Sequence, residues 1–272
     1  MDFLNWVLTV AFKSLLWPFW AWPPVWGLLF ISILSGIILL LLYGRVSNQN
    51  KLKEIKRSIS AALLEAVIYR HDLKTSLKAQ LEMGRGALRY LGAALPPILI
   101  LMIPCLLILA QVNLFYGAQG LQVGQSAIMR LKLDQGADLF NVTLKTSPGL
   151  RSTPPLRRLQ SAEVLWRLDV LENSPQSALI SLPGSGLTLE KAIPVGQAPL
   201  FVPTARFRSL WLGLLYPGEK MIPHTAQIAT IKVAYPSAYY RILGLNLHWL
   251  LVFALFSIGS GVIASRILGV EI

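Results

Sequence analysis

Few residues of this 272-residue chain are of the types that do chemistry at neutral pH, and those few are scattered. The three histidines are His71, His224 and His248, and the single cysteine, Cys105, lies inside an apolar run. Catalysis needs acid, base or nucleophilic groups gathered in one place, and a metal site needs several ligands at short spacing. No HExxH, CxxC, GxSxG or Walker-type motif is present. The sequence therefore predicts a protein that is not an enzyme and holds no metal or cofactor.

The composition is that of a membrane protein. The chain is 54% hydrophobic and only 14% charged, whereas a soluble domain carries about 25% charged residues. This excludes an ordinary soluble enzyme and a disordered protein. The net charge of +12 comes without a motif that reads RNA or DNA. We therefore expect the lipid bilayer, and not nucleic acid, to be the partner of the basic residues.

Three segments are long and apolar enough to span a bilayer, which takes about 20 residues. They are residues 25–43, 93–116 and 246–267. Residues 1–24 precede the first span and are rich in tryptophan, which favours the headgroup level of a membrane. We predict a helix from Asp2 to Leu16 that lies in the interface, followed by a break at Pro18, Pro23 and Pro24.

The distribution of basic residues predicts the orientation of the chain. Residues 44–92 carry ten basic and four acidic side chains, a net charge of +6 within 49 residues. Short basic loops stay in the cytoplasm, and long translocated domains follow this rule poorly. We therefore place residues 44–92 and the C-terminus inside, and the N-terminus and residues 117–243 outside. The outer segment has no cysteine, which favours a bacterial inner membrane over a secretory lumen.

The cytoplasmic segment is predicted to be a helical hairpin. Apolar residues recur at spacings of three and four, first as Leu52, Ile55, Ile59, Leu63 and Val67, and then as Leu73, Leu77 and Leu81. Asp72 stands where it can cap the second helix, and Gly84 with Gly86 predicts a looser chain before the second span. The alternative is a solvated connector whose only role is spacing.

The outer segment, residues 117–243, predicts an antiparallel β-sandwich. Short β-type runs are separated by Gly, Pro, Ser and Asn, as between Ile128 and Leu133, where apolar and polar residues alternate. Six or seven such runs suggest a sandwich of about 110 residues. We expect one strand within residues 207–217 and a turn at residues 183–186. The predicted fold is thus a three-span α-helical membrane protein with a cytoplasmic helical hairpin and an extracytoplasmic β-sandwich.

Polar residues and prolines within or beside the spans are candidate site residues. Polar groups at membrane depth face other protein or a wet cavity, and a proline in a span frees a backbone carbonyl. The polar candidates are Ser32, Ser35, Gln111, Asn113 and His248, and the predicted kink residues are Pro96, Pro97 and Pro104. Close packing between spans would explain the polar residues equally well.

The order of these elements resembles the YidC/Oxa membrane-insertase superfamily. The residues that carry the resemblance are the 45–92 hairpin and the run from Arg85 and Arg89 through Pro96 and Pro97 to Pro104. Proteins of that family keep a cytoplasmic coiled hairpin after the first core span and a hydrophilic groove that opens to the cytoplasm. The resemblance implies a role in inserting or assembling other membrane proteins.

Two functional hypotheses follow. In the first, Arg45, Arg85 and Arg89 attract acidic flanks of a client protein, and Ser32 and Ser35 line a groove that lowers the cost of passing polar segments. In the second, the chain is a non-catalytic scaffold subunit whose outer β-domain binds partner proteins. Transport of a small ligand would need a homo-oligomer, because three spans barely enclose a path. A groove lined by the serines and arginines would favour the first hypothesis, and tightly packed spans the second.

Overall fold

The computed structural model describes residues 2–69, 71–182, 187–196 and 201–271. They form two compact units, Met1–Ile31 with Leu107–Phe253, and Ser32–Leu106 with Ala254–Ile272. Three helices are long and apolar enough to cross a membrane: α2 (Pro24–Val46), α4 (Leu73–Tyr116) and α6 (Trp249–Leu268). This confirms the predicted combination of three long apolar helices with a β-domain.

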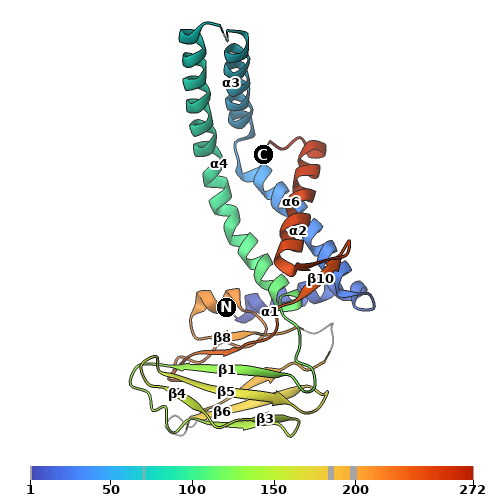
Figure 1. Cartoon of the computed structure of the whole chain (residues 1–272), viewed down its shortest axis with the longest axis vertical. Coiled ribbons are helices and arrows are strands. Elements are labelled where there is room, and N and C mark those ends of the chain that lie inside the picture. Colours follow the sequence, from blue (N-terminus) through green and yellow to red (C-terminus); the bar gives the residue numbers. More distant parts are fainter. Residues whose placement is uncertain (1, 70, 183–186, 197–200, 272) are drawn as a thin grey trace. The chain divides into compact units, whose positions relative to one another are not determined.

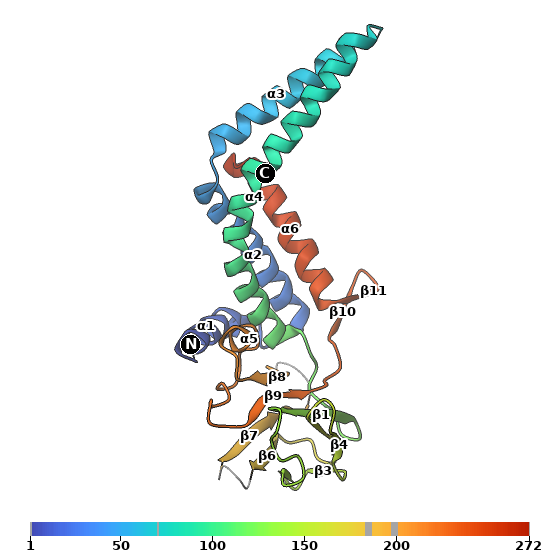
Figure 2. The same cartoon turned by 90° about the vertical axis from the view of Figure 1, so that its left-hand side faces the viewer.

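The first unit contains two antiparallel sheets that share one core (Figures 1 and 2). The larger sheet has the order β3-β5-β1-β9-β8, with β4 paired to β5, and the smaller has the order β2-β6-β7. The strands of the larger sheet are β1 (Ser126–Leu133), β3 (Leu150–Ser152), β4 (Leu156–Arg158), β5 (Glu163–Val170), β8 (Ala205–Phe207) and β9 (Ile228–Val233). Those of the smaller sheet are β2 (Thr143–Thr146), β6 (Gln176–Leu182) and β7 (Leu187–Ile193).

Side-chain alternation fixes the register of these strands. In β1 the side chains of Met129, Leu131 and Leu133 are buried, and those of Arg130 and Lys132 are exposed. Because successive residues of a strand point to opposite faces, this pattern turns one whole face of β1 toward the core. The alternation predicted for residues 128–133 is confirmed. The turn predicted at residues 183–186 lies outside the described residues.

The strand expected within residues 207–217 is wrong over most of its length. A short helix, α5 (Leu210–Leu215), follows Ser209, and only Phe207 belongs to a strand, β8. An apolar run of this length fits a strand and a short helix equally well. In α5, Gly213 and Leu214 are buried while Trp211 is 75% exposed. Trp211 therefore points away from the packed face of α5.

The predicted N-terminal helix is confirmed as α1 (Asp2–Leu16), and the proline break follows as a 3₁₀ turn, η1 (Trp17–Phe19). Three contacts fasten α1 within the first unit. The Asn5 Nδ2 donates to the Gly213 carbonyl at 2.8 Å, the Thr9 hydroxyl donates to Gln111 at 3.2 Å, and the Phe12 and Phe115 rings stack at 6.4 Å. The helix α1 is therefore packed against the rest of the first unit.

A β-hairpin leads into the third apolar helix. Strands β10 (Tyr239–Ile242) and β11 (Leu245–His248) pair in register, and the turn between them is Leu243-Gly244. Both turn residues have positive φ, 50° and 85°, as a two-residue type I′ hairpin requires. Leu247 and His248 therefore belong to β11, and α6 begins at Trp249, three residues later than the predicted start of the span.

In the second unit, α3 (Gln49–Ile68) and the first part of α4 form an antiparallel pair (Figures 1 and 2). Most of their buried and half-buried residues recur at alternating spacings of three and four, the pattern of a coiled-coil seam. These residues are Leu52, Ile55, Ile59, Ala62 and Ala66 of α3, and Ser76, Ala79, Met83, Gly86 and Tyr90 of α4. Gly86 packs directly against the Ile59 side chain. The predicted hairpin is confirmed, but its contact face is built largely from small residues.

Two details of the hairpin prediction need correction. Leu63, Val67, Leu77 and Leu81 are predicted in the apolar stripes, but all four are exposed. The seam instead continues through neighbouring residues, which are Ala62 and Ala66 in α3 and Ser76, Ala79 and Met83 in α4. The chain also does not loosen at Gly84 and Gly86, because α4 is one helix of 44 residues.

Side chains cap the first turns of α3 and α4, and the cap of α4 is the predicted Asp72. The Asp72 carboxylate accepts from the Lys74 amide at 3.1 Å and from the Thr75 hydroxyl at 2.6 Å. The hydrogen bond from Thr75 is the main reason why the pKa of Asp72 is lowered. At α3, the Asn48 side chain accepts from the Lys51 amide at 3.1 Å. Both caps satisfy backbone donors that a helix leaves free.

The first and third apolar helices make close contact in this unit. A Cβ in place of Gly36 would overlap the carbonyl oxygen of Ser257. The Ser260 hydroxyl donates to the Ile33 carbonyl at 3.2 Å. Small residues at such a crossing let two backbones approach, as is usual for helices packed in a membrane.

An ion pair at one end of the β-domain gives a first prediction. The Arg208 guanidinium donates to both Asp134 oxygens, at 2.5 and 2.8 Å, and this hydrogen bonding lowers the pKa of Asp134. Its contribution is therefore complete above the unfolded pKa of about 3.9 and is lost as the pH falls through the lower folded value. We expect Asp134→Asn to lower the melting temperature by about 1 to 3 °C at pH 7. In thermal scans the deficit should shrink steadily as the pH falls below about 4, and a deficit that is independent of pH would contradict this assignment.

Candidate functional site

The two serines of the first span and the basic residues beside the spans do not line a common surface. Ser32 and Ser35 are 0% and 2% exposed, whereas Arg45, Arg85 and Arg89 are exposed. Arg45 follows Ser35 by ten residues on α2, which is about 15 Å along a helix. The structure therefore gives the serines a packed environment and leaves the arginines on the surface.

The three prolines lie inside α4, which continues through all of them. Pro96 is exposed, Pro97 is buried and Pro104 is half-buried. Much of the surface of α4 around them is apolar and exposed, with Ile98 and Ile103 at 51% and 60%. Such a surface needs lipid or another protein to cover it.

The remaining polar candidates lie in the first unit. Gln111 is 1% exposed and accepts the hydrogen bond from Thr9, so it anchors α1. The Asn113 carbonyl accepts from the Gly117 amide at 2.9 Å, where α4 ends. His248, predicted to lie in the third span, ends strand β11, and its Nδ1 accepts from the Leu250 amide at 3.3 Å. Each of these three residues stabilises the packing or the end of a helix, and the three do not form a common site.

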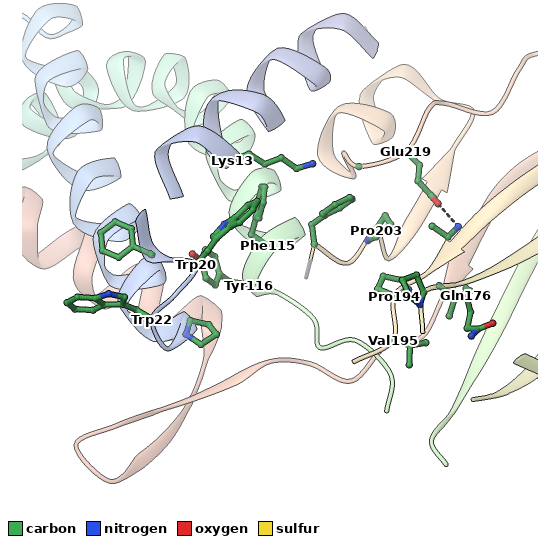
Figure 3. A pocket seen from close by; sticks show the side chains of 17 residues that line it. Lys13, Trp20, Trp22, Phe115, Tyr116, Gln176, Pro194, Val195, Pro203 and Glu219 are labelled. Carbon is green, nitrogen blue, oxygen red and sulfur yellow. Dashed lines mark hydrogen bonds between the residues drawn. The ribbon is translucent and has the colours of Figure 1, made fainter. Parts of the chain in front are cut away.

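The most site-like feature is a cavity beside α1, which we call the α1 cavity (Figure 3). Its volume is about 420 Å³, within the range of about 300–1,000 Å³ of small-molecule sites. Its wall is mainly aromatic and proline side chains, among them Phe19, Trp20, Trp22, Phe115, Phe201 and Pro203. A second cavity of about 410 Å³ lies along α1 and shares Lys13, Phe201 and Glu219 with the first.

Two charged residues reach the α1 cavity. The Lys13 ammonium lies 4.4 Å from the centre of the Phe201 ring, and Figure 3 shows the side chain extending from α1 toward the loop that carries Glu219. No carboxylate among the described residues forms an ion pair with Lys13; the Glu219 carboxylate pairs instead with Lys191. Lys13 is thus the cation of this cavity that lacks an acidic partner.

Lys191 and Glu219 form a buried ion pair behind the wall of the cavity. The Lys191 ammonium, 0% exposed, donates to Glu219 at 2.6 Å and to the Pro203 carbonyl at 2.5 Å. Glu219 also accepts from the Ala192 amide at 3.0 Å, the dashed line of Figure 3. Burial lowers the pKa of Lys191, and the Glu219 carboxylate opposes this shift. The pair joins β7 to the loop before β9 and leaves no net charge there.

The hairpin carries an exposed apolar surface outside its seam, which we call the hairpin patch. It consists of Leu63, Leu64, Val67, Ile68, Leu77, Leu81 and Leu88, each at least 50% exposed. Residues four apart share a helix face, so the side chains of each helix form a stripe. The patch is flanked by exposed cations such as Lys78 and Arg85. Apolar side chains grouped in this way mark an interaction surface more often than scattered ones do.

The chemistry-bearing side chains of the described residues do not gather into a metal site. No group of three or more His, Cys, Asp or Glu side chains could hold a metal ion there. His71 and His224 are exposed on different units. Comparisons of the chain with protein-family models, curated sequences and solved structures found no match.

Sequence reasoning did not identify Lys13 or the Lys191–Glu219 pair. The sequence did contain a signal that Lys191 is buried, because it stands midway between Leu189 and Ile193 at the two-residue spacing of one strand face. In β7 all three side chains are buried. Glu219 stands 28 residues later in a loop, and no spacing rule links the two positions. The position of Lys13 depends on how α1 docks, which periodicity does not reveal.

Proposed function

We propose that the chain is an integral membrane protein that assists the insertion or assembly of other membrane proteins, which dock on its basic helical hairpin. The three apolar helices α2, α4 and α6 support membrane spanning by length and composition. Only one of these spans, the apolar part of α4, lies between the hairpin and the β-domain in the chain, so the two lie on opposite sides. The excess of basic residues assigns the hairpin to the cytoplasm. The host membrane in this proposal is a bacterial inner membrane.

The observation that carries this proposal is the hairpin patch. The seam between α3 and α4 is already filled by other residues, so the leucines of the patch are not needed to hold the hairpin together. Apolar side chains among cations suit a segment that is apolar with acidic flanks. The role proposed for Arg45, Arg85 and Arg89 is to attract such flanks. The proposed activity is docking, without a chemical step.

A second candidate, a scaffold subunit whose outer β-domain binds partners, is favoured by α5. Leu210, Trp211 and Leu212 are exposed by 48%, 75% and 40% on this short helix. The close packing of α2 on α6 and the burial of Ser32 and Ser35 also favour packed spans over an open groove. In this case the partner would be fixed and would bind outside.

The two candidates predict different effects of Leu77→Gln combined with Leu81→Gln. Both side chains are exposed, so the free energy of unfolding should change by less than about 0.5 kcal/mol. If the hairpin docks clients, photo-crosslinks from position 78 to newly made membrane proteins should fall at least about fivefold. The matched control is Leu156→Gln on exposed strand β4 of the β-domain, which should leave the crosslinks unchanged.

A census of membrane proteins after depletion of the chain separates the candidates further. Loss of many proteins, not restored by the Leu77→Gln/Leu81→Gln variant, supports docking of clients. Loss of one fixed complex, restored by that variant but not by Trp211→Ser, supports the scaffold. Unchanged crosslinks in the hairpin variant would contradict the first proposal.

A further inference from the structure

The α1 cavity lies where two apolar helices end. Pro24, the first residue of α2, and Phe115 and Tyr116, the last residues of α4, all line it. If these helices span a membrane, as proposed above, the cavity lies at the boundary between hydrocarbon and headgroups. Trp20 and Trp22 of its wall are 46% and 59% exposed, and tryptophan favours this level.

The wall of the cavity favours a ligand whose larger part is apolar. Rings from η1, from the residues just after it and from the end of α4 meet prolines of the β-domain loops around one space (Figure 3). Two polar residues of the wall are occupied by the protein itself: Gln176 bonds with Ser147 and Ser174, and Glu219 bonds with Lys191 and Ala192. A ligand with many polar groups would therefore find few partners here.

The charged residues at the cavity favour a ligand with an acidic group at one end. The Glu219 carboxylate is neutralised by the buried Lys191 ammonium at 2.6 Å. Lys13, half-buried on α1, has only the Phe201 ring beside its ammonium among the described contacts. A cation at the edge of an apolar cavity is complementary to an acidic group that is attached to an apolar chain.

We propose that the α1 cavity binds one acyl lipid with an acidic head, with the acyl chain against the aromatic wall and the head on Lys13. The acidic head can be the phosphate of an anionic phospholipid or the carboxylate of a fatty acid. Because α1 supplies Lys13 and also packs on α4 and α5 through Thr9 and Asn5, the bound lipid fixes the N-terminal helix against the β-domain.

Native mass spectrometry of the full chain in a maltoside detergent tests this site. The protein is titrated separately with phosphatidylglycerol, phosphatidylcholine of the same chains, and oleate. We expect one lipid retained per chain, with phosphatidylglycerol or oleate preferred over phosphatidylcholine. Lys13→Gln should weaken retention about tenfold, and Lys13→Arg should restore it. Lys145→Gln, on exposed strand β2, makes the same charge change away from the cavity and should have no effect.

The results also distinguish a phospholipid from a fatty acid as the ligand, and they distinguish failure of the lipid site from failure of the membrane assignment. Preference for phosphatidylglycerol assigns a membrane phospholipid, and preference for oleate assigns a fatty acid. Equal retention of all three probes, or equal loss in Lys13→Gln and Lys13→Arg, overturns the site. Alkaline carbonate washing of membranes tests the spans separately. A chain that stays in the membrane but shows no Lys13-dependent lipid refutes only the cavity, and a chain that is washed out refutes the membrane assignment.

Discussion

Replacing Glu219 with leucine is expected to lower the melting temperature of the full chain by about 10 °C. The Lys191 ammonium is 0% exposed and donates to the Glu219 carboxylate and the Pro203 carbonyl, and the substitution leaves only the carbonyl of these two acceptors. Removing one partner of a buried ion pair costs about 3–5 kcal/mol, because the remaining charge is neither solvated nor compensated. In a unit of this size each kcal/mol corresponds to about 2–4 °C. Differential scanning fluorimetry in detergent measures the change.

The double variant Lys191→Met/Glu219→Leu shows whether the loss comes from the orphaned charge. An apolar pair of similar volume is often neutral relative to a buried ion pair, so most of the lost stability should return. The control Asp169→Asn breaks the exposed pair with Arg167, 2.9 Å apart, and should cost less than about 1 kcal/mol. A double variant less stable than Glu219→Leu alone would show that the ion pair itself, and not the removal of one partner, holds the loop to β7.

Substituting Gly36 is expected to disrupt the packing of α2 on α6. The new Cβ would overlap the Ser257 carbonyl, and because this is a backbone atom, the helices themselves must shift. We expect Gly36→Ala to cost about 1–3 kcal/mol and Gly36→Val more. Thermal unfolding in detergent and the yield of folded protein report the loss.

Gly259 of α6 provides the matched control, because a Cβ there would meet no atom within 4 Å. Gly259→Ala should be neutral or slightly stabilising, since alanine is the better helix former by up to about 1 kcal/mol. Equal effects of Gly36→Ala and Gly259→Ala would show that the two helices do not meet at Gly36.

Strong patterns in the sequence were sufficient for the main elements. The helix from Asp2 to Leu16 has the predicted bounds, because an apolar run ends at prolines, and the face of β1 follows from strict alternation. The seam of the hairpin was only partly predicted, because Ala62, Ala79 and Gly86 are too small to stand out in a pattern of hydrophobicity. Leucines dominate that pattern, yet several of them face outward.

The rest depends on contacts between distant segments. Residues 210–215 form a helix instead of a strand, and Asn5 of α1 bonds to Gly213 within it across 208 positions of sequence. The α1 cavity is assembled from α1, the end of α4 and two loops of the β-domain. The periodicity of a single segment does not show which distant segments it contacts. The cavity and the position of Lys13 could therefore be found only in the folded structure.

Labelling of single cysteines in intact cells is the most direct test of the account, which requires the hairpin and the β-domain to lie on opposite sides of a membrane. In a Cys105→Ser background, Lys78→Cys marks the hairpin and Lys145→Cys marks the β-domain, and both positions are exposed. With the β-domain outside and the hairpin inside, a membrane-impermeant maleimide should label position 145 in intact spheroplasts, and position 78 only after lysis. Labelling of position 78 before lysis, or protection of position 145, would contradict it.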